Sequence, residues 1–158
     1  MRKRGAMIAA AVISATAIVL SIVSVASAGK NVTTIHVIEH ATTDVVIDTG
    51  SGAPGTDTTG DLLTFANDLY DASDSNVVGT DQGDCVRIVV GATWECRWVA
   101  MFDDGSITVE GPFSDSGNTV LAITGGTGAF KNARGQMKLE YHDEAGTSFD
   151  FIYKVITD

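Results

Sequence analysis

Two polar residues occupy positions where period-two alternation predicts buried side chains. Glu39 lies two residues after Val37, on the same face of its segment. Asn67 shares a face with Phe65 and Leu69. Burying a carboxylate or an amide is costly unless the group is hydrogen-bonded or functional. A buried carboxylate can stabilise positive charge on a substrate, and a side-chain amide can donate a hydrogen bond to an oxygen atom. The alternatives are a Glu39 that reaches solvent at a strand end and an Asn67 that only bonds to backbone.

The chain has two cysteines, Cys85 and Cys96. If the segment between them is a hairpin that reverses around Gly91, the two cysteines lie directly opposite each other. Arg87 then faces Trp94 in the same way. A directly facing pair has the short Cβ separation that a disulfide requires. We therefore predict a Cys85–Cys96 disulfide, with two free thiols, one of them lining a pocket, as the alternative.

The elements that must position these residues are all predicted to be β-strands. Alternating apolar and polar residues are typical of half-buried strands, and they recur in several short segments separated by turn signals. Many short strands in one small domain indicate a closed barrel or a sandwich, and we favour the barrel because closure removes exposed sheet edges. The clearest alternation covers residues 34–39, 63–70, 106–110 and 149–155, and the turn signals are Asp104-Gly105, Gly125-Gly126 and residues 143–146.

The amino terminus has the pattern of a secretory signal. Three basic residues at positions 2–4 precede an apolar stretch over residues 6–25, and Ala26-Ser27-Ala28 supplies the small residues of a cleavage site. We predict a signal peptide over residues 1–28, cleaved before Gly29, and one exported domain over residues 29–158. The alternative is an uncleaved membrane anchor, which would export the same domain.

The predicted mature domain is strongly acidic. The chain carries 10 Lys and Arg against 20 Asp and Glu, and without the three basic residues of the leader the net charge is −13. This charge disfavours nucleic acid and anionic membrane surfaces as partners, and we expect no stable membrane insertion after cleavage. Asp71, Asp74 and Asn76 lack the ligand spacing of an EF-hand loop. We therefore expect no metal site.

One glycine-rich run carries a family resemblance. It extends from Leu121 through Gly125-Gly126-Thr127-Gly128 to Leu139, and it resembles the signature of allene oxide cyclases and, more loosely, of dirigent proteins. Its flanks are strand-like, so we interpret Gly125-Gly126 as a turn between strands, not as a phosphate-binding loop. The resemblance to allene oxide cyclases covers most of residues 33–156.

The resemblance implies an eight-stranded antiparallel barrel that folds an unstable epoxide of an oxidised fatty acid into a cyclopentenone. It assigns Glu39 to cation stabilisation, Asn67 to holding a water near the substrate oxygen, and Cys85 to shaping the substrate's bend. We expect Glu39 and Asn67 to be catalytic, and no cofactor to be needed. Both related families often form trimers, so a homotrimer is expected. The side chains expected to contact the small apolar substrate are Cys85, Phe65, Phe113 and Arg87. Arg87 could pair with Glu39 or receive a substrate carboxylate, and the alternative is an arginine at the barrel rim.

The chain also departs from the family pattern. Ala41 stands where the family has a second asparagine, and Phe113 stands where it has tyrosine. Three functions are therefore considered. The first is an isomerase or cyclase acting on an oxidised lipid or a polyketide-like molecule. The second is a lipocalin-like barrel that binds an apolar ligand without turning it over, and the third is a dirigent-like template for radical coupling.

Overall fold

The computed structural model describes residues 31–50 and 52–157, and the predicted signal peptide lies outside these residues. Among the described residues there is no helix with the length and hydrophobicity that a membrane crossing requires. The strands are β1 Asn31–His40, β2 Val45–Ile47, β3 Leu62–Phe65, β4 Asp68–Asp71, β5 Val77–Val89, β6 Thr93–Phe102, β7 Gly105–Ser114, β8 Thr119–Gly128, β9 Arg134–Tyr141 and β10 Ser148–Thr157.

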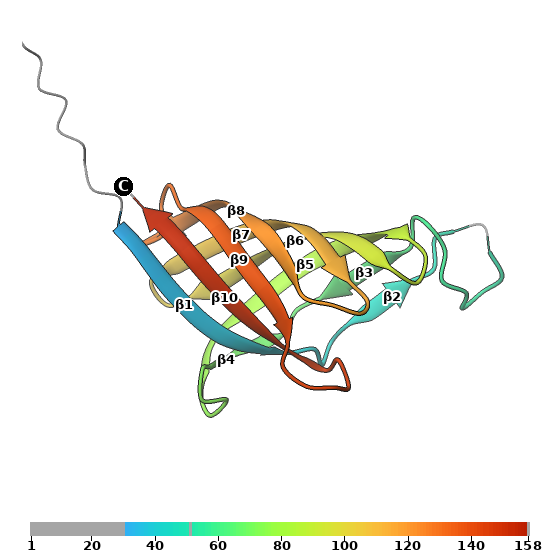
Figure 1. Ribbon diagram of the computed structural model, residues 1–158, viewed down its shortest axis with the longest axis horizontal. Helices are drawn as coiled ribbons and strands as arrows, with labels where there is room; N and C mark the ends of the chain where they lie inside the picture. Colours follow the sequence, from blue (N-terminus) through green and yellow to red (C-terminus); the bar gives the residue numbers. More distant parts are fainter. Residues whose placement is uncertain (1–30, 51, 158) are drawn as a thin grey trace, which may run out of the picture.

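Eight of these strands form a closed antiparallel barrel (Figure 1). The order around the ring is β5-β4-β1-β10-β9-β8-β7-β6, and pairing of β6 with β5 closes it. Strands β6 to β10 follow one another as a meander, whereas β1 is inserted between β4 and β10. The all-β, eight-stranded barrel predicted from the sequence is confirmed.

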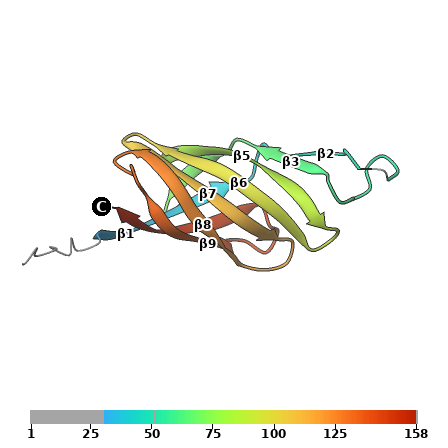
Figure 2. The same ribbon diagram turned by 90° about the horizontal axis from the view of Figure 1, so that it is seen from above.

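The barrel wall changes at one end, where β5 takes a different neighbour. The first part of β5 pairs with β4, and its later part, near Cys85, pairs with β3. Strand β2 pairs only with β3, so at this end the sheet stops at β2 and does not return to β1. Strands β2 and β3 lie at one end of the barrel, beside the β5–β6 hairpin, in both views (Figures 1 and 2).

Alternation along the strands fills the interior. On β10 the side chains of Phe149, Phe151, Tyr153 and Val155 are buried, while those between them are more exposed. The same period holds on β6, where Trp94, Cys96 and Trp98 point inward. Because successive side chains point to opposite faces of a strand, one hydrophobic core lies inside the ring.

The β5–β6 hairpin has the predicted register. Cys85 pairs with Cys96 and Arg87 pairs with Trp94, and a disulfide joins the two cysteines. The predicted disulfide is confirmed, and the alternative of two free thiols is excluded.

The turn predicted at Gly125-Gly126 is wrong, since both glycines lie inside β8. The chain reverses after Gly128 instead, over residues 129–133, with positive φ at Gly128 (58°) and Asn132 (63°). A Cβ atom on Gly126 would lie 2.4 Å from the backbone oxygen of Phe130 and 2.7 Å from that of Ser106. Gly126 therefore permits a close approach of neighbouring backbone rather than a reversal of the chain.

Candidate active site

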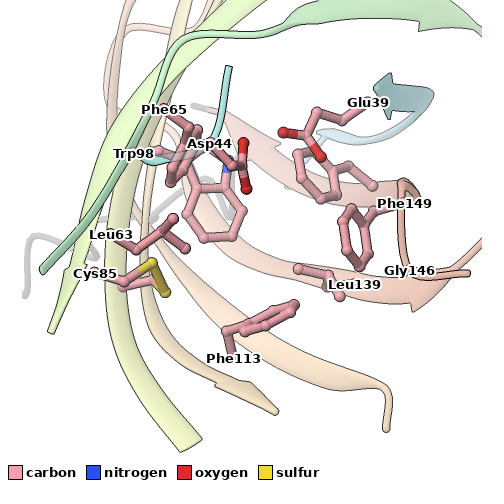
Figure 3. A pocket seen from close by; sticks show the side chains of 12 residues that line it. Glu39, Asp44, Leu63, Phe65, Cys85, Trp98, Phe113, Leu139, Gly146 and Phe149 are labelled. Atoms are coloured by element: carbon pink, nitrogen blue, oxygen red, sulfur yellow. A yellow bond between two sulfur atoms is a disulfide. The ribbon is translucent and has the colours of Figure 1, made fainter. Parts of the chain in front are cut away.

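A cavity of about 210 Å³ lies at the barrel end where β1, β7 and β9 finish. Its wall is mainly aromatic and aliphatic, with two carboxyl groups from Glu39 and Asp44. In Figure 3 these carboxyl groups occupy one part of the cavity, and Phe113 and the disulfide lie across from them. The lining residues are Glu39, Asp44, Leu63, Phe65, Cys85, Cys96, Trp98, Phe113, Leu139, Gly146, Phe149 and Phe151.

Glu39 is the buried acid of this cavity, with 4% of its surface exposed. It lies near the end of β1, between Leu69 on β4 and Phe149 on β10. The Nδ2 atom of Asn67 donates a hydrogen bond of 2.5 Å to its Oε1. Burial and then the nearby carboxylate of Asp81 raise the pKa of Glu39 well above its usual range. The alternative of a solvent-exposed Glu39 is wrong.

Asn67 connects Glu39 to the segment that leads from β1 to β2. Its Oδ1 accepts hydrogen bonds from the backbone N–H groups of Thr42 (3.1 Å) and Thr43 (2.9 Å) and from the Thr43 hydroxyl (3.0 Å). Its Nδ2 donates to Glu39 and, at 2.9 Å, to Asp44. Both amide hydrogens are therefore engaged. This geometry makes Asn67 a residue that positions Glu39, and it leaves no amide hydrogen for the water that the resemblance implies.

Asp81 is a second buried acid beside Asn67, and our sequence reasoning missed it. Only 1% of its surface is exposed. Its Oδ1 accepts a hydrogen bond of 3.2 Å from the backbone N–H of Asn67, and its Oδ2 has no hydrogen-bond partner. Burial raises its pKa, and the carboxylate of Asp44 adds to this effect. A signal was available, because Asp81 lies four residues before Cys85 and therefore on the same face of the strand.

The structure brings together most of the predicted substrate contacts. Cys85, Phe65 and Phe113 all line the cavity. Cys85 does so as part of the disulfide, so it contributes sulfur bulk and no thiol. Phe113 packs edge-on against Phe149, with ring centroids 5.7 Å apart. These residues supply much of the apolar lining of the cavity.

Arg87 is the exception among the predicted contacts, because it lies outside the cavity lining. Its Nε lies 2.7 Å from Asp57 and its Nη1 lies 2.6 Å from Asp115. Its guanidinium also stacks over Trp94, 3.9 Å from the ring centroid. The predicted pairing of Arg87 with Glu39 is wrong, since two loop aspartates and an aromatic face already satisfy the guanidinium.

Sequence reasoning also missed several cavity residues. Trp98 and Phe151 lie in contact, with ring centroids 5.3 Å apart, and both line the cavity. The hairpin register that pairs the cysteines also turns Trp98 inward, so this residue could have been found. Leu139 and Gly146 come from β9 and the β9–β10 loop, and only the closure of the barrel brings them here.

Asp71, Asp74 and Asn76 are the residues for which we considered a calcium site and expected none. In the structure Asp71 accepts hydrogen bonds from Ser73, Ser75 and Asn76, so its oxygens cap a turn. Within residues 31–50 and 52–157, no group of three or more His, Cys, Asp or Glu side chains has the arrangement of a metal site.

The fold and the cavity define a small antiparallel barrel with a buried acid in an apolar pocket. The sequence matches the allene oxide cyclase family over residues 29–144, and the chain belongs to that family. Solved structures of other proteins share this fold.

One of these structures is a pyocyanin demethylase, with 24% identity and a TM-score of 0.63, covering 77% of this chain and 100% of that one. Another is a pterocarpan synthase dirigent protein, with 20% identity and a TM-score of 0.69, covering 82% and 86%. A third is a Diels-Alderase from Streptomyces koyangensis, with 16% identity and a TM-score of 0.58, covering 82% and 69%.

Proposed function

We propose that this chain is an exported isomerase of the cyclase type, which binds one small apolar molecule in its cavity and closes a ring within it. The observation that carries the proposal is the buried carboxyl of Glu39, held by Asn67, in an otherwise apolar wall. An isolated buried acid lowers stability, so a role in chemistry accounts for its presence. Family membership and the structural likeness to a Diels-Alderase support the same class of reaction.

The cavity would contribute by holding the substrate and by opposing charge. Aromatic walls formed by Trp98, Phe113 and Phe149 would keep a flexible chain bent, so that the two carbons that join lie close together. Glu39, once ionised, would stabilise positive charge that develops on the carbon skeleton. An oxidised lipid or a polyketide-like molecule with few polar groups fits such a cavity.

The direct test offers the purified domain a freshly generated fatty-acid allene oxide and measures the enantiomeric excess of the cyclopentenone. A cyclase gives one enantiomer in excess, and Glu39→Gln abolishes that excess while the fold and the affinity for a stable analogue remain. Glu95→Gln is the matched control, because Glu95 is exposed on β6. A racemic product formed at the spontaneous rate would exclude this substrate class.

A dirigent-like coupling template is the second candidate, and the likeness to the pterocarpan synthase dirigent protein favours it. Such a template converts nothing until an oxidase supplies radicals. Adding a laccase together with a monolignol therefore separates the two functions. A barrel that only binds its ligand would show neither conversion, and Glu39→Gln would change its affinity alone.

Export and assembly are also part of this proposal. The pattern of residues 1–28 supports a cleaved signal peptide, so the amino-terminal sequence of the exported protein should begin at Gly29. Recovery of the full-length chain in the membrane fraction would instead indicate a retained anchor. Light scattering of the mature domain tests the homotrimer, and a monomeric mass would contradict it.

A further inference from the structure

We propose that Asp81 acts as a positioning residue that keeps Glu39 protonated in the resting protein, so that Glu39 first donates a proton to a substrate oxygen and later takes one back. This inference rests on the proposed cyclase function and deepens it. It assigns a role to Asp81 and requires a substrate that carries a basic oxygen, such as a strained cyclic ether or a carbonyl.

The placement of the two carboxyl groups on either side of Asn67 is the first support. The side-chain amide of Asn67 donates to Glu39 Oε1 at 2.5 Å, and its backbone N–H donates to Asp81 Oδ1 at 3.2 Å. Two backbone hydrogen bonds between residues 67 and 81, of 3.1 and 2.9 Å, fix their relative position. One residue thus holds both acids in the barrel interior.

The second support is the shortage of donors for Asp81. A buried ionised carboxylate is normally satisfied by several hydrogen bonds or by a cation. Asp81 is 1% exposed, and its carboxyl group accepts one hydrogen bond, from the backbone N–H of Asn67 to Oδ1. Its Oδ2 has no hydrogen-bond partner. Ionising both Asp81 and Glu39 in this environment would be strongly unfavourable, as in other buried carboxyl pairs.

The third support comes from the charges that face the pair. The segment between β1 and β2 contributes Asp44, another acid, and β10 contributes the hydroxyl of Tyr153, which is neutral at ordinary pH. Strands β4 and β6 face the pair with Leu69 and Ala100. Within the described part of the chain, no Lys, Arg or His forms an ion pair with Glu39 or Asp81.

Among the described residues the one buried arginine is Arg87, and Asp57 and Asp115 already pair with it. No cation thus offsets the mutual repulsion of Glu39 and Asp81, and only the hydrogen bonds from Asn67 oppose it. The pair is therefore expected to retain a proton near neutral pH. Burial and this repulsion both raise the pKa of Glu39. Glu39 is the member that lines the cavity, so it is the one that can reach a substrate.

The proposed reaction needs no further reagent, because Glu39 both supplies and recovers the proton. The carboxyl of Glu39 transfers its proton to the substrate oxygen as the C–O bond of a cyclic ether breaks, or as a carbonyl is activated. The electron pair of the broken bond stays on oxygen, and the carbon skeleton becomes a cation beside the new carboxylate. After the ring-forming C–C bond is made, Glu39 removes one proton from the cationic product, so the net reaction is an isomerisation.

Substitution of Asp81 by asparagine tests the idea, because it removes the charge and keeps an acceptor for the Asn67 N–H. Infrared spectroscopy of the resting protein should show a protonated carboxyl at neutral pH that disappears in Glu39→Gln. In Asp81→Asn this band should titrate at lower pH. Asp84→Asn is the matched control, since Asp84 on the same strand is paired with Arg97 at the surface.

Catalysis supplies a second measurement. In the wild type, turnover should fall as the pH rises through the raised pKa of Glu39. In Asp81→Asn this fall in turnover should occur at lower pH. Turnover near neutral pH should then be reduced about 10²-fold with KM unchanged, and the rate should be regained in acid. A purely structural role of Asp81 would leave the pH at which turnover falls unchanged.

The outcomes separate this inference from the proposed function. If no substrate is turned over but the protonated band behaves as expected, the cyclase proposal fails and the role of Asp81 in holding the proton stands. If the wild type has no protonated carboxyl near neutral pH, or Asp81→Asn leaves its titration unchanged, the inference is overturned. Should Asp81→Asn not fold, the wild-type band decides, because two coupled carboxyls titrate in two steps and an isolated one in a single step.

Discussion

The carboxyl groups beside the cavity and those in the connecting loops share one chemistry but lie in opposite environments. Glu39 and Asp81 are buried, and each carboxyl group accepts a single hydrogen bond, from the Asn67 side chain and the Asn67 backbone N–H respectively. Asp61, before β3, instead accepts hydrogen bonds from Thr58, Thr49 and Gly50. The pKa is raised at the cavity and lowered in the loop.

The difference reflects both the depth of each site and the number of hydrogen-bond donors that it offers. Both side chains are 1% exposed, but Asp61 lies in a surface loop and Asp81 lies in the barrel interior. Hydrogen bonds led by that from the Thr58 backbone N–H lower the pKa of Asp61 despite this burial. At Asp81, the cost of burial outweighs the single hydrogen bond from Asn67. The loop thus satisfies its acid with several hydrogen bonds, whereas the cavity leaves its acids short of donors, as the proposed chemistry requires.

The largest expected effect separates the two regions by activity. Glu39→Gln should reduce turnover by about 10²- to 10⁴-fold, as expected for loss of a group that transfers a proton or stabilises charge. Asp61→Asn should leave the turnover of folded protein unchanged. Steady-state rates normalised to folded protein provide the measurement. Comparable losses in both variants would break the distinction.

The pH dependence of stability should have opposite signs in the two regions. A raised pKa means that the folded cavity pair binds more protons than the unfolded chain, so stability falls as pH rises above about 4, where unfolded carboxyls ionise. Each extra bound proton contributes a slope of about 1.4 kcal/mol per pH unit. Glu39→Gln should reduce this slope by about 1.4 kcal/mol per pH unit between about pH 5 and neutral pH. The measurement is the free energy of unfolding in urea at several pH values.

The pair of His142 and Asp150 also makes stability depend on pH. The hydrogen bond to Asp150 raises the pKa of His142, so the contribution of this pair to stability is lost as the pH rises above the usual histidine pKa of about 6.5. The wild type and Glu39→Gln both retain this pair, so the difference between their slopes reports on the cavity alone. Equal slopes would show that the cavity acids ionise normally.

A smaller effect of opposite sign is expected from the loop acids. The pKa of Asp61 is lowered, so its contribution is complete above about pH 4 and is lost as the pH falls. Asp61→Asn should lower the thermal midpoint near neutral pH and lower it less in acid, where the wild-type carboxylate is itself protonated. Calorimetry at the two pH values would show a constant difference if Asp61 did not act through its charge.

The smallest effect is expected for Asp143, in the β9–β10 loop. Its carboxylate accepts hydrogen bonds from Thr147 and Ser148, and the Thr147 hydroxyl is the main reason that its pKa is lowered. Since these groups lie near the surface, Asp143→Asn should shift the thermal midpoint only slightly and leave turnover intact. A loss of turnover would place this loop in the site, beside Gly146, and would weaken the contrast between the two regions.

Local sequence patterns predicted the parts of this structure that depend on local register. Alternation predicted the strands, and one assumed reversal near Gly91 was enough to pair Cys85 with Cys96 and to turn Arg87 toward Trp94. The same pattern placed Glu39 and Asn67 on inward faces. Glycine is ambiguous in such reasoning, because Gly126 permits close backbone approach just as another glycine permits a turn.

Contacts between distant segments could not be predicted in this way. The partners of Arg87 come from the loop before β3 and from the β7–β8 turn, which no strand pattern relates to β5. The joint hold of Asn67 on Glu39 and Asp81 likewise depends on the point where β5 exchanges β4 for β3. Alternation shows which face a residue occupies, but the closed ring decides which faces meet.

The neutralisation of Arg87 by Asp57 and Asp115 has a consequence for the delivery of the substrate. With that guanidinium occupied, a free fatty acid meets no countercharge among the residues that line the cavity, and it meets the carboxylate of Asp44 instead. Two like charges repel by about 2 kcal/mol at a separation of about 8 Å and an effective dielectric constant of about 20. A fatty acid presented as an ester or a lactone avoids this cost, so under the proposed function we expect an esterified acid to bind more tightly than the free acid.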